Sequence, residues 1–547
     1  MKAISYAAAR IVSLLIALGL GLAYGASPCP RFPAGSVIAQ PQDLFSTHGV
    51  LTVNFTYETT VDQYGNTLYC FVTDSGIESP TLHVRPGDRL VIQLKNNLPA
   101  PASSDAAAAM PGMTVSGKAS STCGAVTMTP SSVNIHYHGT NTPPTCHQDE
   151  VIRTMINSGE TFQYDVQFPP DEPPGLYWYH PHIHGISEAA VLGGASGALI
   201  VEGIQNIVPE AAGLPEQTLI IRDNLVPGNP APGGDIPSWD ISLNYVPVPS
   251  PVYTPAVIRM KPGERQLWRV LNASADTIID LQLVYDGAPQ PLEVVALDGV
   301  PTGSQDGTSR GKRVWYSDIL LAPAARAEFI VTGPAAAVQQ ATLMTLNVDT
   351  GPDGDNDPTR PIATIRVSGG APEPPLSIPD TIESPHKQRF AGLERESPTA
   401  ERRLYFSEVL SDPNDPDSPT NFYITVDGQT PTLFNSANPP AIATTQGAVE
   451  DWTIENRSLE NHEFHIHQIH FLLLEQNGIP VNNPEYLDTV QVPYWSGSGP
   501  YPSVKVRMDF RGNLVGDFVY HCHILGHEDN GMMAIIRVKP RVERGRR

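Results

Sequence analysis

This chain is short of basic residues, and the shortage limits the partners it can have. Lysine and arginine together number 34 against 57 aspartates and glutamates, so the net charge at pH 7 is −23. The only basic cluster is the tail from Lys539 to Arg547. So negative a surface repels phosphate groups, and we expect neither nucleic acid nor an anionic membrane surface as a partner.

Long apolar runs are also scarce. The one pronounced run, Ile11 to Leu22, follows Lys2 and Arg10 and is followed by the small residues of Ala23 to Ala26. It is shorter than the ~20 residues that a membrane-spanning helix needs, and its charged, apolar and small-residue parts are those of a secretory signal peptide. We therefore expect residues 1–25 to be cleaved and the mature protein to be exported, to the periplasm or beyond, with no membrane span.

Cysteine is rare too, with five residues in the chain. Four lie in the N-terminal third, and none of these has the Cys-x-x-Cys spacing of a structural zinc site. An even number of cysteines in an exported chain favours two disulfides. The four residues are Cys29, Cys70, Cys123 and Cys146, and three pairings of them are possible. The fifth, Cys522, stands alone near the C-terminus.

Proline and glycine, by contrast, are abundant. The chain has 54 prolines and 45 glycines with only 17% charged residues, a composition typical of many short strands joined by turns. We expect an all-β fold. At 547 residues the chain exceeds one ordinary hydrophobic core, which indicates several domains.

An internal repeat divides the chain. In three segments a turn glycine opens an alternating strand that closes on an asparagine nine positions later: Gly87 to Asn96, Gly263 to Asn272, and Gly447 to Asn456. Repetition on this scale indicates duplicated domains. We expect the boundaries to lie near 204 and 372, the second in a proline-rich linker. The expected units are 26–204, 205–372 and 373–547.

Histidines recur in pairs with the spacing of metal ligands. The pairs are His136 and His138, His180 and His182, His465 and His467, and His521 and His523. Within each pair, alternation along a strand directs both imidazoles to one face. A single His-x-His pair in a β-rich protein is at least as often structural as metal-binding. Four such pairs indicate a cluster of metal ions, the more so because the two members of one pair flank a cysteine.

The cysteine between the last two histidines, Cys522, points to the opposite face of its strand. With His527 and Met532 it supplies three of the four ligands of a blue copper site, namely a thiolate, an imidazole and a weak axial thioether. His462 has the opposite strand parity to His465 and is free to be the fourth. Metal held by Cys522 would be joined through the backbone to metal held by its neighbours, which suits electron transfer.

In these motifs and in their order, the chain resembles the multicopper oxidases, in particular their three-domain laccase-like and bacterial copper-oxidase branch, over nearly the whole mature sequence. The resemblance implies three cupredoxin-like Greek-key β-sandwich domains and four coppers per chain. It implies these ligands: a type 1 copper at His462, Cys522 and His527 with Met532 axial, a type 2 copper at His136 and His465, and two type 3 coppers, one at His138, His180 and His523 and one at His182, His467 and His521. The family usually has proline after the first histidine of its third motif, where this chain has Glu463.

The resemblance also implies an activity, in which electrons from a reductant reach Cys522, pass to His521 and His523, and reduce O2 to water. We expect a phenol or aromatic amine as the reductant, because the chain lacks the Met-rich insert expected of a cuprous oxidase. Oxidation of Cu(I) or Fe(II) is the alternative. Asp149 and Glu528 are candidate proton donors, or else hydrogen-bond acceptors for ligand imidazoles.

Two non-enzymatic functions are weighed against this one. An electron carrier would need only one domain, and a scaffold that had lost copper would show gaps among its ligands. This chain has the full ligand set and the length of several domains, so we expect an enzyme, acting as a monomer.

Overall fold

The repeated segments form equivalent strands in the computed structural model, which describes residues 27–101, 123, 127–226, 236–305, 310–370, 388–415 and 418–541. The expected signal peptide lies outside these residues. Each repeat's turn glycine has a positive φ, between 67° and 96°, which glycine adopts without steric penalty. The strands that follow are β5 (Arg89–Asn96), β14 (Arg265–Asn272) and β27 (Val449–Asn456). Each pairs in parallel with an earlier strand: β2 (Val50–Val61), β10 (Glu216–Leu225) and β24 (Ala400–Leu410).

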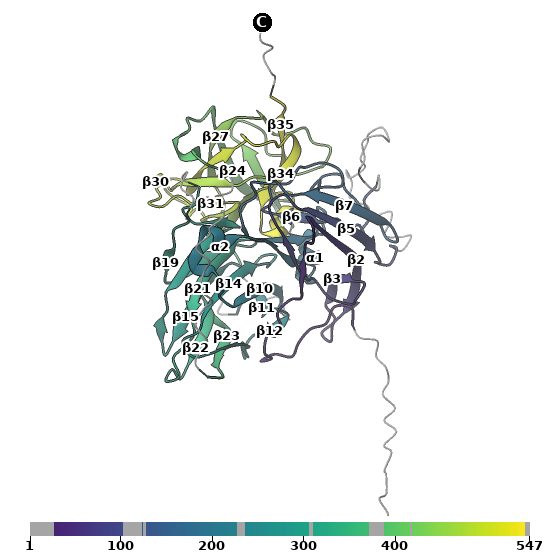
Figure 1. Ribbon diagram of the computed structural model, residues 1–547. Helices are drawn as coiled ribbons and strands as arrows, with labels where there is room; N and C mark the ends of the chain where they lie inside the picture. Colours follow the sequence, from purple (N-terminus) through teal and green to yellow (C-terminus); the bar gives the residue numbers. More distant parts are fainter. Residues whose placement is uncertain are drawn as a thin grey trace, which may run out of the picture.

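Within these residues the strands form six sheets that enclose three main apolar cores, one for each repeat. Each core takes residues from two sheets, because alternate side chains of a strand point to opposite faces. The fold is all-β and sandwich-like, as predicted. In Figure 1 the first, second and third sandwiches are the purple, the teal and the green-to-yellow parts.

The first sandwich has a five-stranded sheet, β1 (Asp43–Phe45), β4 (Thr81–Val84), β9 (Gly197–Val201), β8 (Gly175–His180) and β6 (His136–His138), and a four-stranded sheet, β3 (Thr67–Thr73), β2, β5 and β7 (Thr161–Gln167).

The second has an eight-stranded sheet, β12 (Val246–Val248), β11 (Trp239–Leu243), β10, β14, β21 (Arg326–Thr332), β17 (Leu292–Leu297), β18 (Val300–Pro301) and β19 (Val314–Tyr316), and a six-stranded sheet, β13 (Ala256–Met260), β23 (Arg360–Val367), β22 (Ala341–Leu346), β15 (Ile279–Tyr285), β16 (Ala288–Pro289) and β20 (Ile319–Leu321).

The third has a seven-stranded sheet, β25 (Thr420–Val426), β24, β27, β33 (Ser503–Asp509), β29 (Phe471–Gln476), β30 (Ile479–Pro480) and β31 (Tyr486–Leu487), and a five-stranded sheet, β26 (Ile442–Thr445), β35 (Met533–Lys539), β34 (Gly516–Cys522), β28 (His462–Ile466) and β32 (Thr489–Val492).

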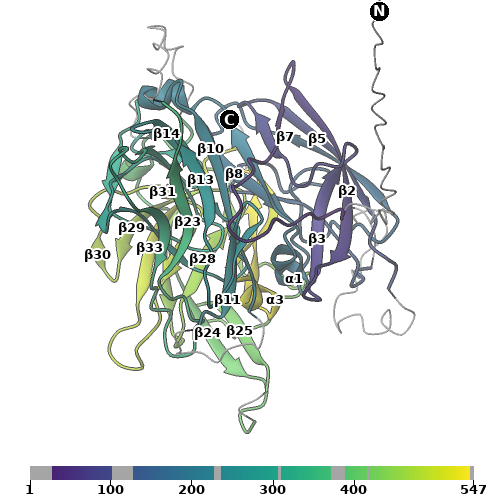
Figure 2. The same ribbon diagram turned by 90° about the horizontal axis from the view of Figure 1, so that it is seen from below.

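The few helices are short, and two of them lie where the sandwiches meet. These are α1 (Ser187–Leu192) and α3 (Leu525–Asp529), which contact each other (Figure 2). The first residue of α3 donates its N–H to the carbonyl of Ala275 in the second sandwich, at 2.9 Å. The other helices are α2 (Ile204–Ile207) and the 3-10 turns Pro209–Ala211 and Leu393–Arg395. Within the described ranges, no helix has the length and apolarity to cross a membrane.

Two disulfides join the four N-terminal cysteines. The pairs are Cys29 with Cys70 and Cys123 with Cys146. This is one of the three pairings that the sequence allowed. Cys522 is free and buried.

Candidate metal centre

The eight paired histidines converge between the first and third sandwiches. Four come from β6, β8 and the segment after β8, and four from β28, β34 and the residues that follow them. His136 lies opposite His180 in the first sandwich, as His465 lies opposite His521 in the third. All eight are at most 2% exposed. The ring nitrogens of His182, His467 and His521 form one group within metal-binding reach, and those of His136, His138 and His180 form another.

Several of these imidazoles have one ring nitrogen held by a hydrogen bond and the other without a hydrogen-bond partner among the described residues. The Nδ1–H groups of His180, His465 and His521 donate to backbone carbonyls at 2.8–2.9 Å. The Nε2 atoms of His136, His180 and His465 are buried and have no hydrogen-bond partner among the described residues. This is the arrangement of metal-ligating histidines, in which the second nitrogen is held by an outer partner and the first is left for the metal.

Electrostatics agree with that arrangement. Burial lowers the pKa of His180 to about 3 and that of His521 to about 4, so both rings are neutral, the form that binds metal. The Nε2 atom of His521 lies 3.3 Å from that of His182 and 3.2 Å from that of His467. Lone pairs that converge so closely in a buried site are stabilised by a shared cation, and copper is among the ions that imidazole suits.

A second ligand set lies on the other face of β34. The Cys522 sulfur is 3.7 Å from Nδ1 of both His462 and His527, and these two nitrogens are 3.0 Å apart. Met532 belongs to the same buried core as the cysteine, whereas Met533 packs in a different cluster on the opposite face of β35. One thiolate, two imidazoles and a nearby thioether are the donor set of a blue copper site.

The two predicted acids lie against the histidine cluster. Asp149 accepts hydrogen bonds from Nδ1 of His136 at 3.0 Å, from the Tyr137 N–H at 3.0 Å and from Gln468 at 2.6 Å. Burial raises the pKa of Asp149 to about 8. The Glu528 carboxylate lies 3.7 Å from His182 Nδ1 and 3.4 Å from His521 Nδ1 and is fully buried.

A third acid, Asp488, was not predicted from the sequence. Its carboxylate lies 3.1 Å from His138 Nε2, and its backbone carbonyl accepts a hydrogen bond from His465. Arg326 of the second sandwich binds the same carboxylate through two N–H groups, at 2.8 and 2.5 Å. No spacing in the chain connects Asp488 with a histidine 350 positions earlier, so only the fold brings them together.

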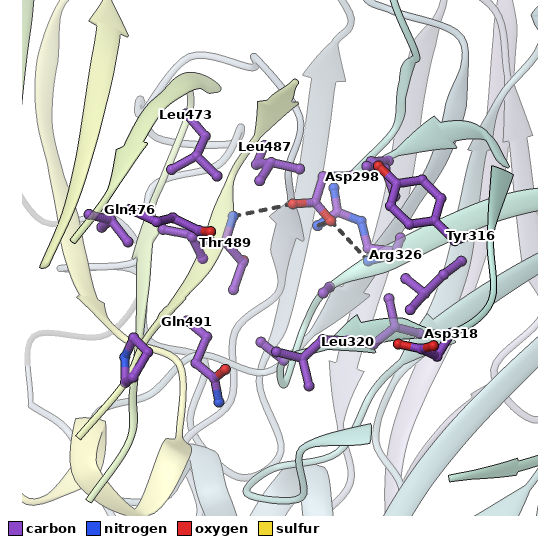
Figure 3. A pocket seen from close by; sticks show the side chains of 18 of the residues that line it. Asp298, Tyr316, Asp318, Leu320, Arg326, Leu473, Gln476, Leu487, Thr489 and Gln491 are labelled. Carbon is purple, nitrogen blue, oxygen red and sulfur yellow. Dashed lines mark hydrogen bonds and ion pairs between the residues drawn. The ribbon is translucent and has the colours of Figure 1, made fainter. Parts of the chain in front are cut away.

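Arg326 also lines a cavity of about 400 Å³ between the second and third sandwiches. Figure 3 shows Asp298 on its wall, linked to Arg326 and to the backbone N–H of Thr489. Most of the lining is aliphatic, with Tyr316, Gln476 and other polar side chains among it. The volume lies within the range of small-molecule pockets.

Comparison with known proteins gives consistent matches. Residues 109–206 and 413–542 match two family models, both described as multicopper oxidase. Proteins named multicopper oxidase mco from Staphylococcus haemolyticus and Staphylococcus epidermidis are each 24% identical over 468 residues, which is 84% of this chain and 81% of theirs.

Solved structures share the fold. A multicopper oxidase from Campylobacter jejuni, titled a metallo-oxidase, is 22% identical with a TM-score of 0.65, over 93% of this chain and 96% of that one. A laccase-like multicopper oxidase from Ochrobactrum is 18% identical with a TM-score of 0.60, over 92% of this chain and 100% of that one.

The buried ion pair between Arg326 and Asp488 allows a test of whether the second sandwich stabilises the site. Replacing Arg326 with methionine leaves Asp488 as a buried carboxylate without its cation, which costs about 3–5 kcal/mol. We expect the urea midpoint of Arg326→Met to fall accordingly. The control is Arg313→Met in the same sandwich, whose partner pair with Glu293 is partly exposed and contributes about 1 kcal/mol or less. Equal losses in the two variants would contradict a structural role for the buried pair.

Proposed function

Because this chain belongs to the multicopper oxidase family and is a copper-dependent oxidoreductase that uses O2, we propose that it oxidises phenols or aromatic amines by single electrons and reduces O2 to water, as a laccase does. The observation that carries the proposal is the position of Cys522 between His521 and His523. Its sulfur lies with His462 and His527, while His521 lies with His182 and His467, and the His523 ring centroid is 4.9 Å from that of His138. Because Cys522 is the direct neighbour of His521 and of His523 in the chain, a single peptide link on either side connects the two ligand sets.

The ligand assignment is taken from the family resemblance and is part of this proposal. Its set of His182, His467 and His521 coincides with a group of converging ring nitrogens, whereas His136 lies with His138 and His180 as well as with His465 and His467. Bound copper supplies one-electron redox chemistry and a place for O2. We assign four coppers per chain, which would be held as follows: type 1, His462, Cys522, His527 and Met532; type 2, His136 and His465; type 3, His138, His180 and His523, and His182, His467 and His521.

Asp149 and Glu528 are proposed to hold the protons that O2 reduction consumes. Both carboxyls are buried against cluster histidines, at Nδ1 of His136 and at Nδ1 of His182 and His521. A carboxyl so placed can give a proton to a group in the cluster without help from bulk water. Asp149 has a second task, since its contact with His136 fixes which ring nitrogen carries the hydrogen.

His527 is the proposed point of electron entry, because its side chain is 12% exposed while His462 is fully buried. The choice of an organic reductant rests on the sequence, which lacks the Met-rich insert expected of a cuprous oxidase. A metal-ion reductant remains the second candidate for a specific reason: the Glu460 carboxylate lies 3.3 Å from Nε2 of His527 and hydrogen-bonds to Glu408. Paired carboxylates suit a hard cation such as Fe(II) better than an uncharged phenol.

The domain limits and the location of the protein belong to the same proposal. The units are taken as 26–204, 205–372 and 373–547, with copper ligands in the first and third. Export through a cleaved signal at residues 1–25 is supported by the two disulfides, which form and persist in oxidising compartments. The protein is taken to act as a monomer.

The first test removes the thiolate. Cys522→Ser leaves the His521 and His523 side chains in place, so we expect it to abolish the blue absorption and turnover while the cluster coppers stay bound. Absorption spectra and metal analysis of copper-loaded protein measure both effects. Met533→Leu, a change on the opposite face of β35, is the control and should remain blue. Turnover near the wild-type rate in Cys522→Ser would contradict the proposal.

The second test concerns protons. Asp149→Asn and Glu528→Gln keep size but remove the acid, and general acids contribute roughly 100-fold or more to rate. Reoxidation of the reduced enzyme by O2 should slow to that extent in stopped-flow experiments, while reduction by substrate stays fast. Glu150→Gln is the control, because this buried acid binds Thr154 rather than a histidine. Lost copper, or slow reduction with normal reoxidation, would instead indicate a structural role.

The third test separates the two reductant classes. Steady-state rates with a methoxyphenol, Fe(II) and Cu(I) are compared in the wild type and in Glu460→Gln. If the protein is laccase-like, the phenol has the highest kcat/KM and the variant changes it by less than about tenfold, or 1.4 kcal/mol. A larger loss confined to Fe(II), together with a higher wild-type rate for that ion, would establish the metal-ion alternative.

A further inference from the structure

Glu463 touches the Cys522 sulfur through its backbone and not through its side chain. Its N–H donates a hydrogen bond to Cys522 Sγ at 3.3 Å. The residue lies in β28, directly after His462, and the next residue, Phe464, is paired with Cys522 across the sheet. The contact is therefore fixed by strand register, and Glu463 is fully buried.

The position of this N–H in the sheet makes it a specific donor to sulfur. A strand N–H ordinarily bonds to the carbonyl of a neighbouring strand, whereas this one is directed at the thiolate. The carbonyl of the same residue accepts the N–H of His523 at 2.8 Å. The main chain of Glu463 thus holds the cysteine sulfur on one side and a cluster histidine on the other.

The side chain of Glu463 has no comparable contact. Both carboxyl oxygens are buried without a hydrogen-bond partner in the described parts of the chain. Its cross-strand neighbour Gln491 has a buried amide nitrogen that also lacks one. The hydrogen bond from Glu463 to the sulfur therefore comes from its backbone alone, and any residue except proline can supply that N–H.

A hydrogen bond to the thiolate changes how the sulfur binds copper. Electron density shared with the N–H is withheld from the metal, and Cu(II) depends on thiolate donation more than Cu(I) does. The reduced site is then favoured, and hydrogen bonding around the cysteine sulfur is one of the means by which proteins tune the potential of such sites.

We infer that the backbone N–H of Glu463 raises the reduction potential of the copper bound by Cys522, and that this residue is a positioning residue that sets how weak a reductant the protein can oxidise. The inference rests on the proposed function, since it requires copper at Cys522. It concerns the driving force at that copper and is independent of whether the reductant is a phenol or a metal ion.

The experiment compares Glu463→Pro, which lacks the N–H, with Glu463→Gln, which keeps the N–H and nearly the same side-chain volume. Both are loaded with copper, and the blue absorption is followed through a redox titration. We expect a lower midpoint potential and a shifted blue band in Glu463→Pro, and values near wild type in Glu463→Gln. Turnover of Glu463→Pro should fall more for electron-poor phenols than for electron-rich ones.

Equal potentials in the two variants, or a higher one in Glu463→Pro, would overturn the inference while the proposed function stands. A copper-loaded wild type without a blue band would overturn the type 1 assignment and the inference with it. If Glu463→Pro does not fold, the unaltered chain provides the measurement. The Ile524 N–H also hydrogen-bonds to Cys522, so pulsed EPR is applied to oxidised protein labelled with 15N in its glutamates only. A resolved 15N coupling to the copper–sulfur unit is expected from the Glu463 amide, and its absence would refute the hydrogen bond.

Discussion

Eight imidazoles are buried together between the first and third sandwiches, and burying their polar nitrogens costs free energy. The rest of the molecule is arranged around this cluster. A buried polar atom without a partner costs about 1–3 kcal/mol, and several ring nitrogens of the cluster are in this position among the described residues. Burial also keeps the rings neutral, so they repel one another less and offer lone pairs. Metal binding is the interaction that turns this cost into stabilisation, which couples folding to the metal.

The second sandwich contributes no histidine to this centre, yet it holds the centre's outer support. Arg326 neutralises Asp488, whose carboxylate contacts His138 and whose carbonyl orients His465. Asp298, from the same sandwich, accepts the N–H groups of Asp488 and Thr489. All three sandwiches therefore position the cluster, the second through the charged side chains of Arg326 and Asp298 and the hydrogen bonds they make.

The sequence predicted those parts of the molecule that depend on local periodicity. The all-β fold and the repeat strands followed from turn glycines and alternation, and the histidine pairs followed from strand parity. The pairs converge from two sandwiches, and their division into individual copper sites stays a prediction. The sequence could not predict contacts of single residues that belong to no repeat and have no characteristic spacing from another motif. Asp488, Arg326 and the choice among three disulfide pairings are of this kind. Glu463 was visible as a departure from the family pattern, but its bond to sulfur required strand register.

The split of the ligands between the two ends of the chain has a consequence for how the protein is made. The strands that hold His136 and His180 are complete early in synthesis, whereas β34 is nearly the last strand to be formed. Until then, the chain holds only the four histidines of the first sandwich, which are half of the cluster. Copper that arrives early meets an incomplete set of donors, and copper that arrives late meets a closed cluster. A full complement of copper would thus require that the last sandwich has been translated, has folded and has docked on the first.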